Sequence, residues 1–586
     1  MNTFIHKNLI KATSSFILTG TLLLSFGSCS SRDEETKNPD GNAGMQGTFL
    51  SFNIVGIEEE ENITNLATAS IKNTEKSSLT SIASEKVIST ENFDALISAE
   101  GQITSDKTKG LSASLTHSYT GSYTGAMAAV TNSPMITGTK YRLLIYDAAS
   151  NTLIKNVDAT SGTNPSIQVD AGKQYKWYIV STNDNSTPSV NTATGIVSAA
   201  SLANKDVLWN QGVIDAQYGQ NNMSIVLKRN TARIQLDLDT RGMFGTINNT
   251  TSVEVGTGTG SAFSSIIKTG DLNVLTGQYS NLQNVSAVTG GSMVNKAGAG
   301  AGGAAGATKT ATFYTVGSTP IPANNLRIRL NQLDLNMDDN STRSFSNSIV
   351  PYSNIPVTPT LGNRYTLNVR LIESGVRLKG LLWARTNLIY SSQADKYRFR
   401  PDNEYSQPDK DTEYWNWMAA TPTGSSSDNT DACSKVYPEG MWRMPTSTEF
   451  SNLGQPDDKK ENYGLFLGAN FSAVYNLDAG NNLNTSFPTN SQRLFLSFYG
   501  YRTAPGFLGG TSVSDSPGGI FLGALGGGGA YYWSSSSANT NNANYWYMSY
   551  SRFAWFVGWS NAEVRSGAKT EGRMVRCVRT TSTPNT

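Results

Sequence analysis

The chain has 586 residues, enough for several domains, and carries 46 Lys and Arg against 45 Asp and Glu, for a formal net charge of +1. Because no long basic block is present, and phosphate binding needs concentrated positive charge, we expect no nucleic acid among its partners. Only two histidines and three cysteines occur, which excludes a histidine-based catalytic triad and a His/Cys zinc cluster.

Residues 1–28 have the features of an export signal. Two lysines, Lys7 and Lys11, precede an apolar run of about a dozen residues, which ends in two small residues just before Cys29. The run falls short of the roughly 20 residues needed to cross a bilayer. It therefore predicts a signal peptide that is removed on export.

Cys29 stands in a sequence that resembles a bacterial lipobox. Gly27 and Ser28 precede it, although Phe26 occupies a place where leucine is more usual. The resemblance implies acylation at Cys29, and several acyl chains anchor a protein stably in a membrane. The acidic residues 33–35, in a linker spanning 29–47, resemble the export signal of surface-exposed outer-membrane lipoproteins. The alternative is a plain secretory signal with Cys29 left over.

Period-2 alternation of apolar residues predicts β-strands along residues 48–375. In residues 49–55, Leu50, Phe52 and Ile54 fall on one side. Gly, Asn, Asp and Pro punctuate the intervals, which predicts two β-sandwiches, 48–220 and 221–375. The polar stretch 57–109 is weakly patterned, with a short helix expected at 92–97. The other predicted strands are 140–146, 174–180, 224–238, 326–333 and 364–371.

The composition changes near Ser374 and Gly375. Eight of the ten tryptophans follow this point, and so do Cys433 and Cys577. We therefore expect a third domain at 376–586. Once Cys29 is assigned to acylation, two cysteines remain, and in an exported protein such a pair predicts one disulfide.

A short helix is expected after Pro445. Thr446 and Glu449 have the spacing of a capping box, and the helix that follows would bury Phe450 and Leu453.

Four predicted strands with their flanks carry a family resemblance over about residues 45–374. They resemble the fimbrillin family, the two-domain pilins of the type V pilus. The resemblance implies proteolytic loss of the first strand, residues 49–55, and filling of the vacated groove by a strand donated from another fimbrial subunit. A generic β-sandwich lipoprotein is the alternative. The stretches are GTKYRLLIYD (138–147), AGKQYKWYIVSTND (171–184), VLKRNTARIQLDL (226–238) and GNRYTLNVRL (362–371).

The cleavage that this resemblance implies lacks an arginine site. No arginine lies between Arg32 and Arg142. An Arg-specific protease would thus have no site after the first strand, and Lys72, Lys76 and Lys86 are the candidates for processing.

The last third carries a second resemblance, over about residues 376–580. Its motif order is similar to the Fibrobacter-type paralogous surface domain, whose fold relates to C-type lectins and formylglycine-generating enzymes. We therefore predict a mainly β protein: two tandem fimbrillin-like β-sandwiches and a mixed α+β C-type-lectin-like domain. The motifs are LLWARTNL (381–388), CSKVYPEGMWRMPT (433–446), YWSSS (532–536) and VRCVR (575–579).

Residues 531–559 are rich in aromatic side chains, which give a large contact area at low entropic cost. Each could instead belong to the core, as we expect for Trp533. The candidates for ligand binding are Tyr545, Tyr547, Tyr550, Arg552, Trp555, Phe556, Trp559 and Asn561.

No enzymatic or metal site is assigned. A disulfide would leave no thiol for redox chemistry, and no spacing selects a pair of catalytic carboxylates. Residues 407–409 and 455–457 both read QPD, a triplet of galactose-type C-type lectins, but their position favours turns or chance. We predict that the protein has no cofactor, and calcium is the one ion whose binding the sequence leaves open.

Together these features predict a cell-surface fimbrial subunit. A C-terminal extension of about 210 residues would hinder donation of a terminal strand, so the chain suits the tip of a fimbria, where its last domain would bind a host or bacterial surface protein or glycan. The alternative is a surface lipoprotein that binds glycan or protein and never polymerises.

Overall fold

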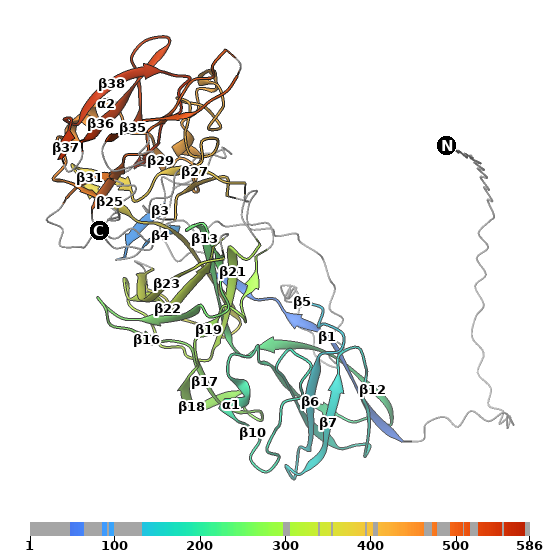
Figure 1. Cartoon of the computed structure of the whole chain (residues 1–586). Helices are drawn as coiled ribbons and strands as arrows, with labels where there is room; N and C mark the ends of the chain where they lie inside the picture. The colour runs from blue at the N-terminus through green and yellow to red at the C-terminus, as the bar shows by residue number, and fades with distance from the viewer. Residues whose placement is uncertain are drawn as a thin grey trace, which may run out of the picture. The chain divides into compact units, whose positions relative to one another are not determined.

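The chain is mainly β, as the sequence predicts, and its helices are short (Figure 1). The described residues all belong to one compact unit, 47–586. The predicted signal peptide and Cys29 lie outside the described residues. The computed structural model describes residues 47–63, 85–90, 93–98, 132–296, 305–337, 340–352, 356–392, 395–401, 408–461, 471–476, 493–507, 509–515, 525–553 and 556–580.

Four helices occur in these ranges: α1 (Ala199–Leu202), α2 (Ser447–Leu453) and the 3-10 helices η1 (Ser426–Asp428) and η2 (Ala432–Lys435). None of the described helices has the length and apolar character needed to span a bilayer.

The first sheet has eight strands and includes the N-terminal strand β1. Strand β6 is buried on both faces: Leu143 and Ile145 join one core cluster, and Leu144 and Tyr146 join another. This explains the nearly continuous apolar run KYRLLIY. The strand order is β5 (Asn132–Ser133), β1 (Thr48–Glu58), β12 (Gly219–Arg229), β11 (Leu208–Asp215), β9 (Gln174–Ser181), β6 (Lys140–Asp147) and β7 (Leu153–Thr160), with β8 (Ser166–Val169) paired to β1.

A small three-stranded sheet packs with helix α1 against one face of the first sheet. Val197, Leu202 and Leu272 of this layer share a core cluster with Leu144 and Val180 of the first sheet. The small sheet consists of β10 (Ile196–Val197), β17 (Lys268–Asn273) and β18 (Gln278–Asn284).

Two further sheets pack face to face and form a β-sandwich. Leu236 and Leu238 of one sheet share a core with Ile328 and Leu330 of the other. The first of these sheets contains β20 (Val294–Asn295), β21 (Thr308–Thr315), β13 (Ala232–Gly242), β24 (Asn363–Glu373), β4 (Phe93–Ser98), β3 (Glu85–Ser89) and β2 (Glu61–Ile63). The second contains β14 (Thr246–Ile247), β22 (Leu326–Asn336), β15 (Ser252–Thr257), β16 (Ser264–Ser265), β19 (Val288–Thr289) and β23 (Thr342–Pro351).

Two details differ from the sequence-based expectations. The run 224–238 is divided between β12 and β13, so the change of sheet falls at Asn230 and Thr231, beyond the boundary expected at 220 and 221. The helix expected at 92–97 is wrong: residues 93–98 form strand β4, which pairs antiparallel with β24. Residues 93–97 are all buried, and this continuous burial hides the strand period.

The C-terminal third consists of smaller sheets and contains α2. Thr446 and Glu449 make the predicted capping box, and Phe450 and Leu453 are buried. Its strands are β25 (Gly375–Leu378), β26 (Leu381–Ala384), β27 (Leu388–Tyr390), β28 (Tyr397–Phe399), β29 (Trp442–Arg443), β30 (Asp458–Glu461), β31 (Phe471–Tyr475), β32 (Leu494–Ser497), β33 (Tyr501–Arg502), β34 (Val513–Ser514), β35 (Leu525–Ser537), β36 (Asn542–Phe553), β37 (Phe556–Trp559), β38 (Glu563–Ala568) and β39 (Val578–Arg579).

The C-terminal third shares a core with the β-sandwich that precedes it. The ring of Phe399 makes edge contacts with Phe244 of the sandwich at 5.8 Å and with Trp442 at 4.9 Å. Tyr437 donates a hydrogen bond to Asp239 at 2.7 Å. The last third is therefore joined to the sandwich by packing as well as by the chain.

Candidate functional site

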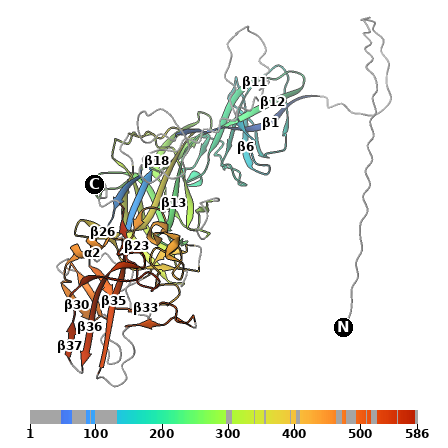
Figure 2. The same ribbon diagram turned by 90° about the horizontal axis from the view of Figure 1, so that it is seen from above.

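The N-terminal segment 48–63 contributes to two different sheets. Strand β1 pairs in parallel with β12 of the first sheet, and β2 pairs in parallel with β24 of the sandwich sheet that contains β13. Figure 2 shows β1 beside β12 from a second direction. A single extended segment thus takes part in both sheets, and it includes residues 49–55, which are expected to be removed.

The side chains of β1 fill the core of the first sheet. Leu50 and Phe52 are fully buried, and the Phe52 ring contacts Trp177 edge-on at 6.2 Å. Gly56 lies at a register shift against β12, where a Cβ atom would come within 2.7 Å of the Ser133 carbonyl oxygen. Apolar side chains and one glycine therefore fix the register of this segment.

The end of the segment is held by charge. The Glu60 carboxylate lies 3.3 Å from Arg229 Nε and forms a second ion pair with Arg233. Arg229 also lies 3.2 Å from Asp206. Burial raises the pKa of Glu60, and the positive charges of Arg233 and Arg229 oppose that rise.

The three candidate processing lysines fall in different places. Lys72 and Lys76 lie outside the described residues. Lys86 lies in β3, where its backbone pairs with Ile97 of β4. Cleavage after Lys86 would require this pairing to open, because a protease needs an accessible, extended chain.

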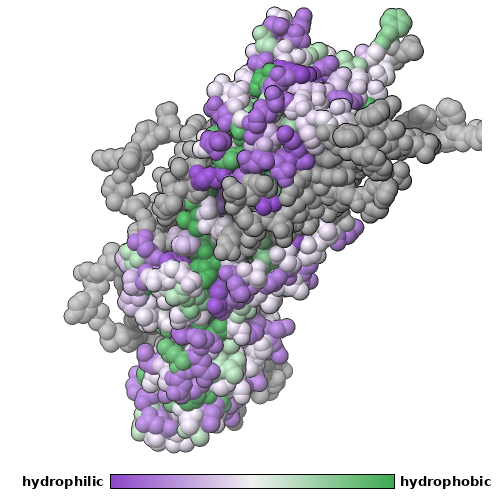
Figure 3. All heavy atoms as spheres, turned by 60° about the vertical axis from the view of Figure 1, so that its left-hand side comes forward, coloured by the Kyte–Doolittle hydropathy of each residue, from purple (hydrophilic) through white to green (hydrophobic). Residues whose placement is uncertain are grey.

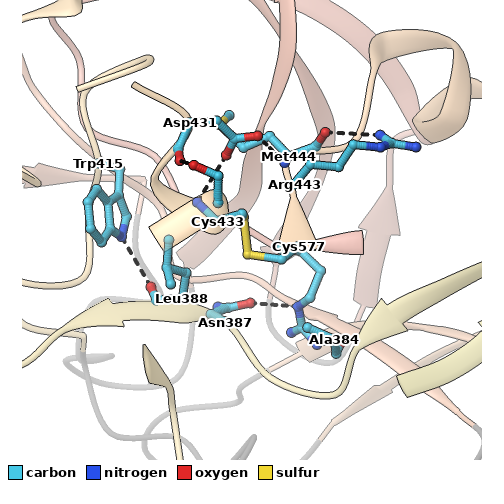
Figure 4. The surroundings of a disulfide bond; sticks show 11 residues. Ala384, Asn387, Leu388, Trp415, Asp431, Cys433, Arg443, Met444 and Cys577 are labelled. Atoms are coloured by element: carbon cyan, nitrogen blue, oxygen red, sulfur yellow. Dashed lines mark hydrogen bonds between the residues drawn. A yellow bond between two sulfur atoms is a disulfide. The ribbon is translucent and has the colours of Figure 1, made fainter. Parts of the chain in front are cut away.

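The disulfide expected between Cys433 and Cys577 is present, with a Cα–Cα distance of 5.7 Å. Both cysteines are fully buried. Figure 4 shows that Asp431 organises the surrounding turn: its carboxylate accepts hydrogen bonds from the backbone N–H groups of Cys433 at 2.9 Å and Met444 at 2.8 Å. Burial raises the pKa of Asp431, and these two bonds oppose the rise.

Four aromatic rings surround Arg573, three of them on one face of the hairpin β35–β36 and the fourth, Tyr501, in β33. The guanidinium carbon lies 3.8 Å from the centre of the Tyr545 ring and 4.5 Å from that of Trp533. The rings of Tyr501 and Tyr531 lie slightly farther away. Arg573 is buried and pairs with Glu571, while its Nε and Nη1 atoms make no hydrogen bond. Cation–π contacts therefore provide much of its stabilisation.

The candidate ligand residues are divided between the two faces of this hairpin. The Tyr545 ring lies beside Arg573 and the Tyr547 ring lies beside Arg565, and both tyrosines are buried. Tyr550 lies on the opposite face, where its ring contacts Phe498 and Trp559.

The remaining candidates are placed as follows. Trp559 is half-buried, and Asn561 is exposed in the loop after β37. Trp555 and the side chains of Arg552 and Phe556 lie outside the described residues. Ligand contact by any of the eight residues stays a prediction.

Sequence reasoning missed Phe507, the most exposed aromatic side chain among the described residues. It lies between β33 and β34 in a loop closed by a hydrogen bond from Gly506 N–H to the Gly510 carbonyl, and its side chain is fully exposed. The loop leaves the sheet next to Tyr501, whose ring lies 4.9 Å from that of Tyr531. On the face shown in Figure 3, hydrophobic residues lie among hydrophilic ones.

The described parts of the QPD triplets serve local turns. Asp409 accepts hydrogen bonds from the backbone of Asp411 and Thr412, and Asp457 accepts one from Asn476. Gln455 exchanges two hydrogen bonds with Ala562. Within the described ranges, no three His, Cys, Asp or Glu side chains are grouped so that they could hold a metal ion.

The chain was compared with known proteins at three levels. No family model matches it, and no curated protein matches it. Solved structures of bacterial proteins named for cell adhesion or fimbriae do match, and the three described below have TM-scores of 0.30 or less, which are too low to support an argument.

A candidate cell adhesion protein of Bacteroides fragilis is 10% identical, with a TM-score of 0.30, and the match covers 56% of this chain and 96% of that one. A fimbrial assembly protein of Parabacteroides distasonis is 11% identical, with a TM-score of 0.20, and the match covers 39% of this chain and 82% of that one. The fimbrial anchor protein Mfa2 of Porphyromonas gingivalis is 8% identical, with a TM-score of 0.19, and the match covers 37% of this chain and 91% of that one.

Proposed function

We propose that the protein is a fimbrial subunit that acts as an adhesin at the tip of a fimbria, exported as a lipoprotein acylated at Cys29. The observation that carries the proposal is the segment 48–63, which pairs with β12 in one sheet and with β24 in another and buries Leu50 and Phe52. A strand of another subunit could complete the same edges by β-augmentation. The solved structures described above are named as cell adhesion or fimbrial proteins, and their TM-scores give the proposal no independent weight.

Removal of the segment would leave most of the fold intact. Strands β3 and β4 follow it in the sequence and pair with each other and with β24. Cleavage between Ile63 and Glu85 would release β1 and β2 only. Lys72 and Lys76 fall in this interval, so we favour them over Lys86 as processing sites.

Replacing Lys72 and Lys76 together by alanine tests this step. We expect the variant to remain in the outer-membrane fraction and to be missing from sheared filaments, because its own strand would still fill the groove. The measurement is an immunoblot of both fractions. Lys86→Ala is the matched control and should assemble normally; assembly of the double variant would contradict the proposed processing.

The C-terminal third is the proposed recognition head. Phe507 is fully exposed in the loop between β33 and β34, and exposed aromatic side chains are frequent anchors of interfaces. The shared core around Phe399 would hold this head firmly on the body. A surface protein or glycan is the proposed ligand.

Replacing Phe507 by alanine is expected to lower adhesion about tenfold or more without changing the melting temperature, because a fully exposed side chain contributes little to the folded state. The measurement is retention of protein-coated beads on epithelial cell monolayers. Tyr218→Ala, which also removes an exposed aromatic ring but from the first sheet, is the control. Equal retention of all three proteins would contradict this role.

A second function is favoured by one observation. Strand β1 is paired on both sides, with β12 on one side and with β8 and β5 on the other. Such a strand could be permanent, in which case the protein would be a surface receptor that never polymerises.

A further inference from the structure

Glu60 occupies the point where the N-terminal segment passes from one sheet to the next. The pairing of β1 with β12 ends at Ile57, and the pairing of β2 with β24 begins at Glu61. Four consecutive glutamates, Glu58 to Glu61, span this crossing. They are not equivalent: the Glu60 side chain is only 5% exposed, whereas Glu59 is exposed to solvent.

The groups around Glu60 belong to parts of the protein that stay behind if the segment leaves. Arg229 is the last residue of β12 and Arg233 lies in β13; their side chains are 12% and 19% exposed. Asp206 would still balance Arg229. Arg233 would retain its hydrogen bond with Tyr314 but lose its carboxylate partner.

An empty groove would therefore end in a positive charge that lacks its carboxylate partner. Removing one member of a shielded ion pair is strongly unfavourable, because the remaining charge has neither its partner nor full hydration. An incoming strand that supplies only apolar side chains would leave this charge uncompensated. One that places a carboxylate at the same position would neutralise it.

We propose that the strand which replaces residues 48–63 is recognised by a carboxylate set against Arg229 and Arg233. The inference rests on the proposed function and adds the chemistry of the partner. The occupant is an extended strand of another subunit that lies in the register of β1. It carries apolar residues at the positions of Leu50 and Phe52, and Asp or Glu at the position of Glu60.

Glycine at the position of Gly56 completes the pattern. A Cβ atom there would lie 2.7 Å from the backbone oxygen of Ser133, so a larger residue would displace the neighbouring strand β5. The glycine and the carboxylate are four positions apart. A strand shifted by one residue would misplace both, so the pair sets the register as well as the choice of partner.

The test uses the full protein with a site for a sequence-specific protease inserted between Ile63 and Glu85. After nicking, fluorescent peptides with the sequence of residues 47–63 are offered as competitors for the protein's own strand. Three peptides are compared: the natural sequence, Glu60→Gln and the matched control Glu59→Gln. Bound peptide is separated from free peptide and measured by its fluorescence.

We expect the natural and Glu59→Gln peptides to exchange into the groove equally, and the Glu60→Gln peptide to bind at least about tenfold more weakly. In a protein carrying Arg233→Gln, the preference for the natural peptide over the Glu60→Gln peptide should shrink. Equal binding of all three peptides would overturn the inference while leaving strand replacement intact. Binding of none of them, with the nicked strand retained, would overturn the proposed function and the inference together.

Discussion

Replacing Asp94 by asparagine is expected to lower the free energy of unfolding by about 3–5 kcal/mol, because it leaves the Arg579 guanidinium buried without a counter-charge. The two side chains form an ion pair at 2.6 Å and are 3% and 1% exposed. Asp94 lies in β4 and Arg579 in β39, so the pair ties the N-terminal hairpin to the last strand of the chain.

Neighbouring buried charges make the site around Arg579 sensitive to loss of the Asp94 charge. Glu373 pairs with Arg343 at 2.8 Å, and its backbone oxygen accepts a hydrogen bond from Arg579. Burial lowers the pKa of Arg385 to about 10, against the opposing charges of Asp94 and Glu373. Loss of the Asp94 charge therefore leaves an excess of buried positive charge.

The change is measured by urea unfolding of the purified protein, followed by tryptophan fluorescence, which reports mainly on the C-terminal third. Asp170→Asn, which removes an exposed partner of Lys173, is the control and should change stability by less than about 1 kcal/mol. Arg579→Met combined with Asp94→Asn should recover part of the loss. An Asp94→Asn protein as stable as the control would contradict the account of this joint.

Replacing Cys433 and Cys577 by alanine is expected to destabilise the C-terminal third by about 2–5 kcal/mol. The bridge joins residues 144 positions apart, so it restricts a long loop of the unfolded chain. Thermal unfolding with and without reductant measures the effect.

The double variant provides its own control, because reductant should leave its unfolding unchanged while destabilising the natural protein once the buried bond is reached. A natural protein that unfolds identically after complete reduction would show that the bridge contributes nothing to stability.

Much of the fold can be predicted from the sequence because its strands have alternating or continuous apolar runs. Strand β1 is predicted from Leu50 and Phe52, and both are buried. Strand β4 is missed because residues 93–97 are all buried, so its sequence lacks the alternation of apolar and polar residues that marks a half-buried strand. Strand β18 is missed for the opposite reason: its residues are almost all polar and mostly exposed, so no period marks it.

The candidate sites are less predictable, since they depend on contacts distant in sequence. Glu60 is one of four adjacent glutamates, and only the approach of Arg229 and Arg233 distinguishes it. Phe507 stands in a glycine-rich stretch without periodicity, so its exposure cannot be deduced from the pattern. The high aromatic content of residues 531–559 is visible in the sequence. The division of these side chains between two faces follows from the pairing of β35 with β36.

The central claim is that the N-terminal segment is removed and its place taken by a strand of another subunit. The most direct test is the N-terminal mass of the protein recovered from sheared surface filaments. The account predicts a chain that starts after Lys72 or Lys76, without β1 and without an acyl group. A chain that starts at acylated Cys29 and is found only in the membrane fraction would contradict it and identify an anchored receptor.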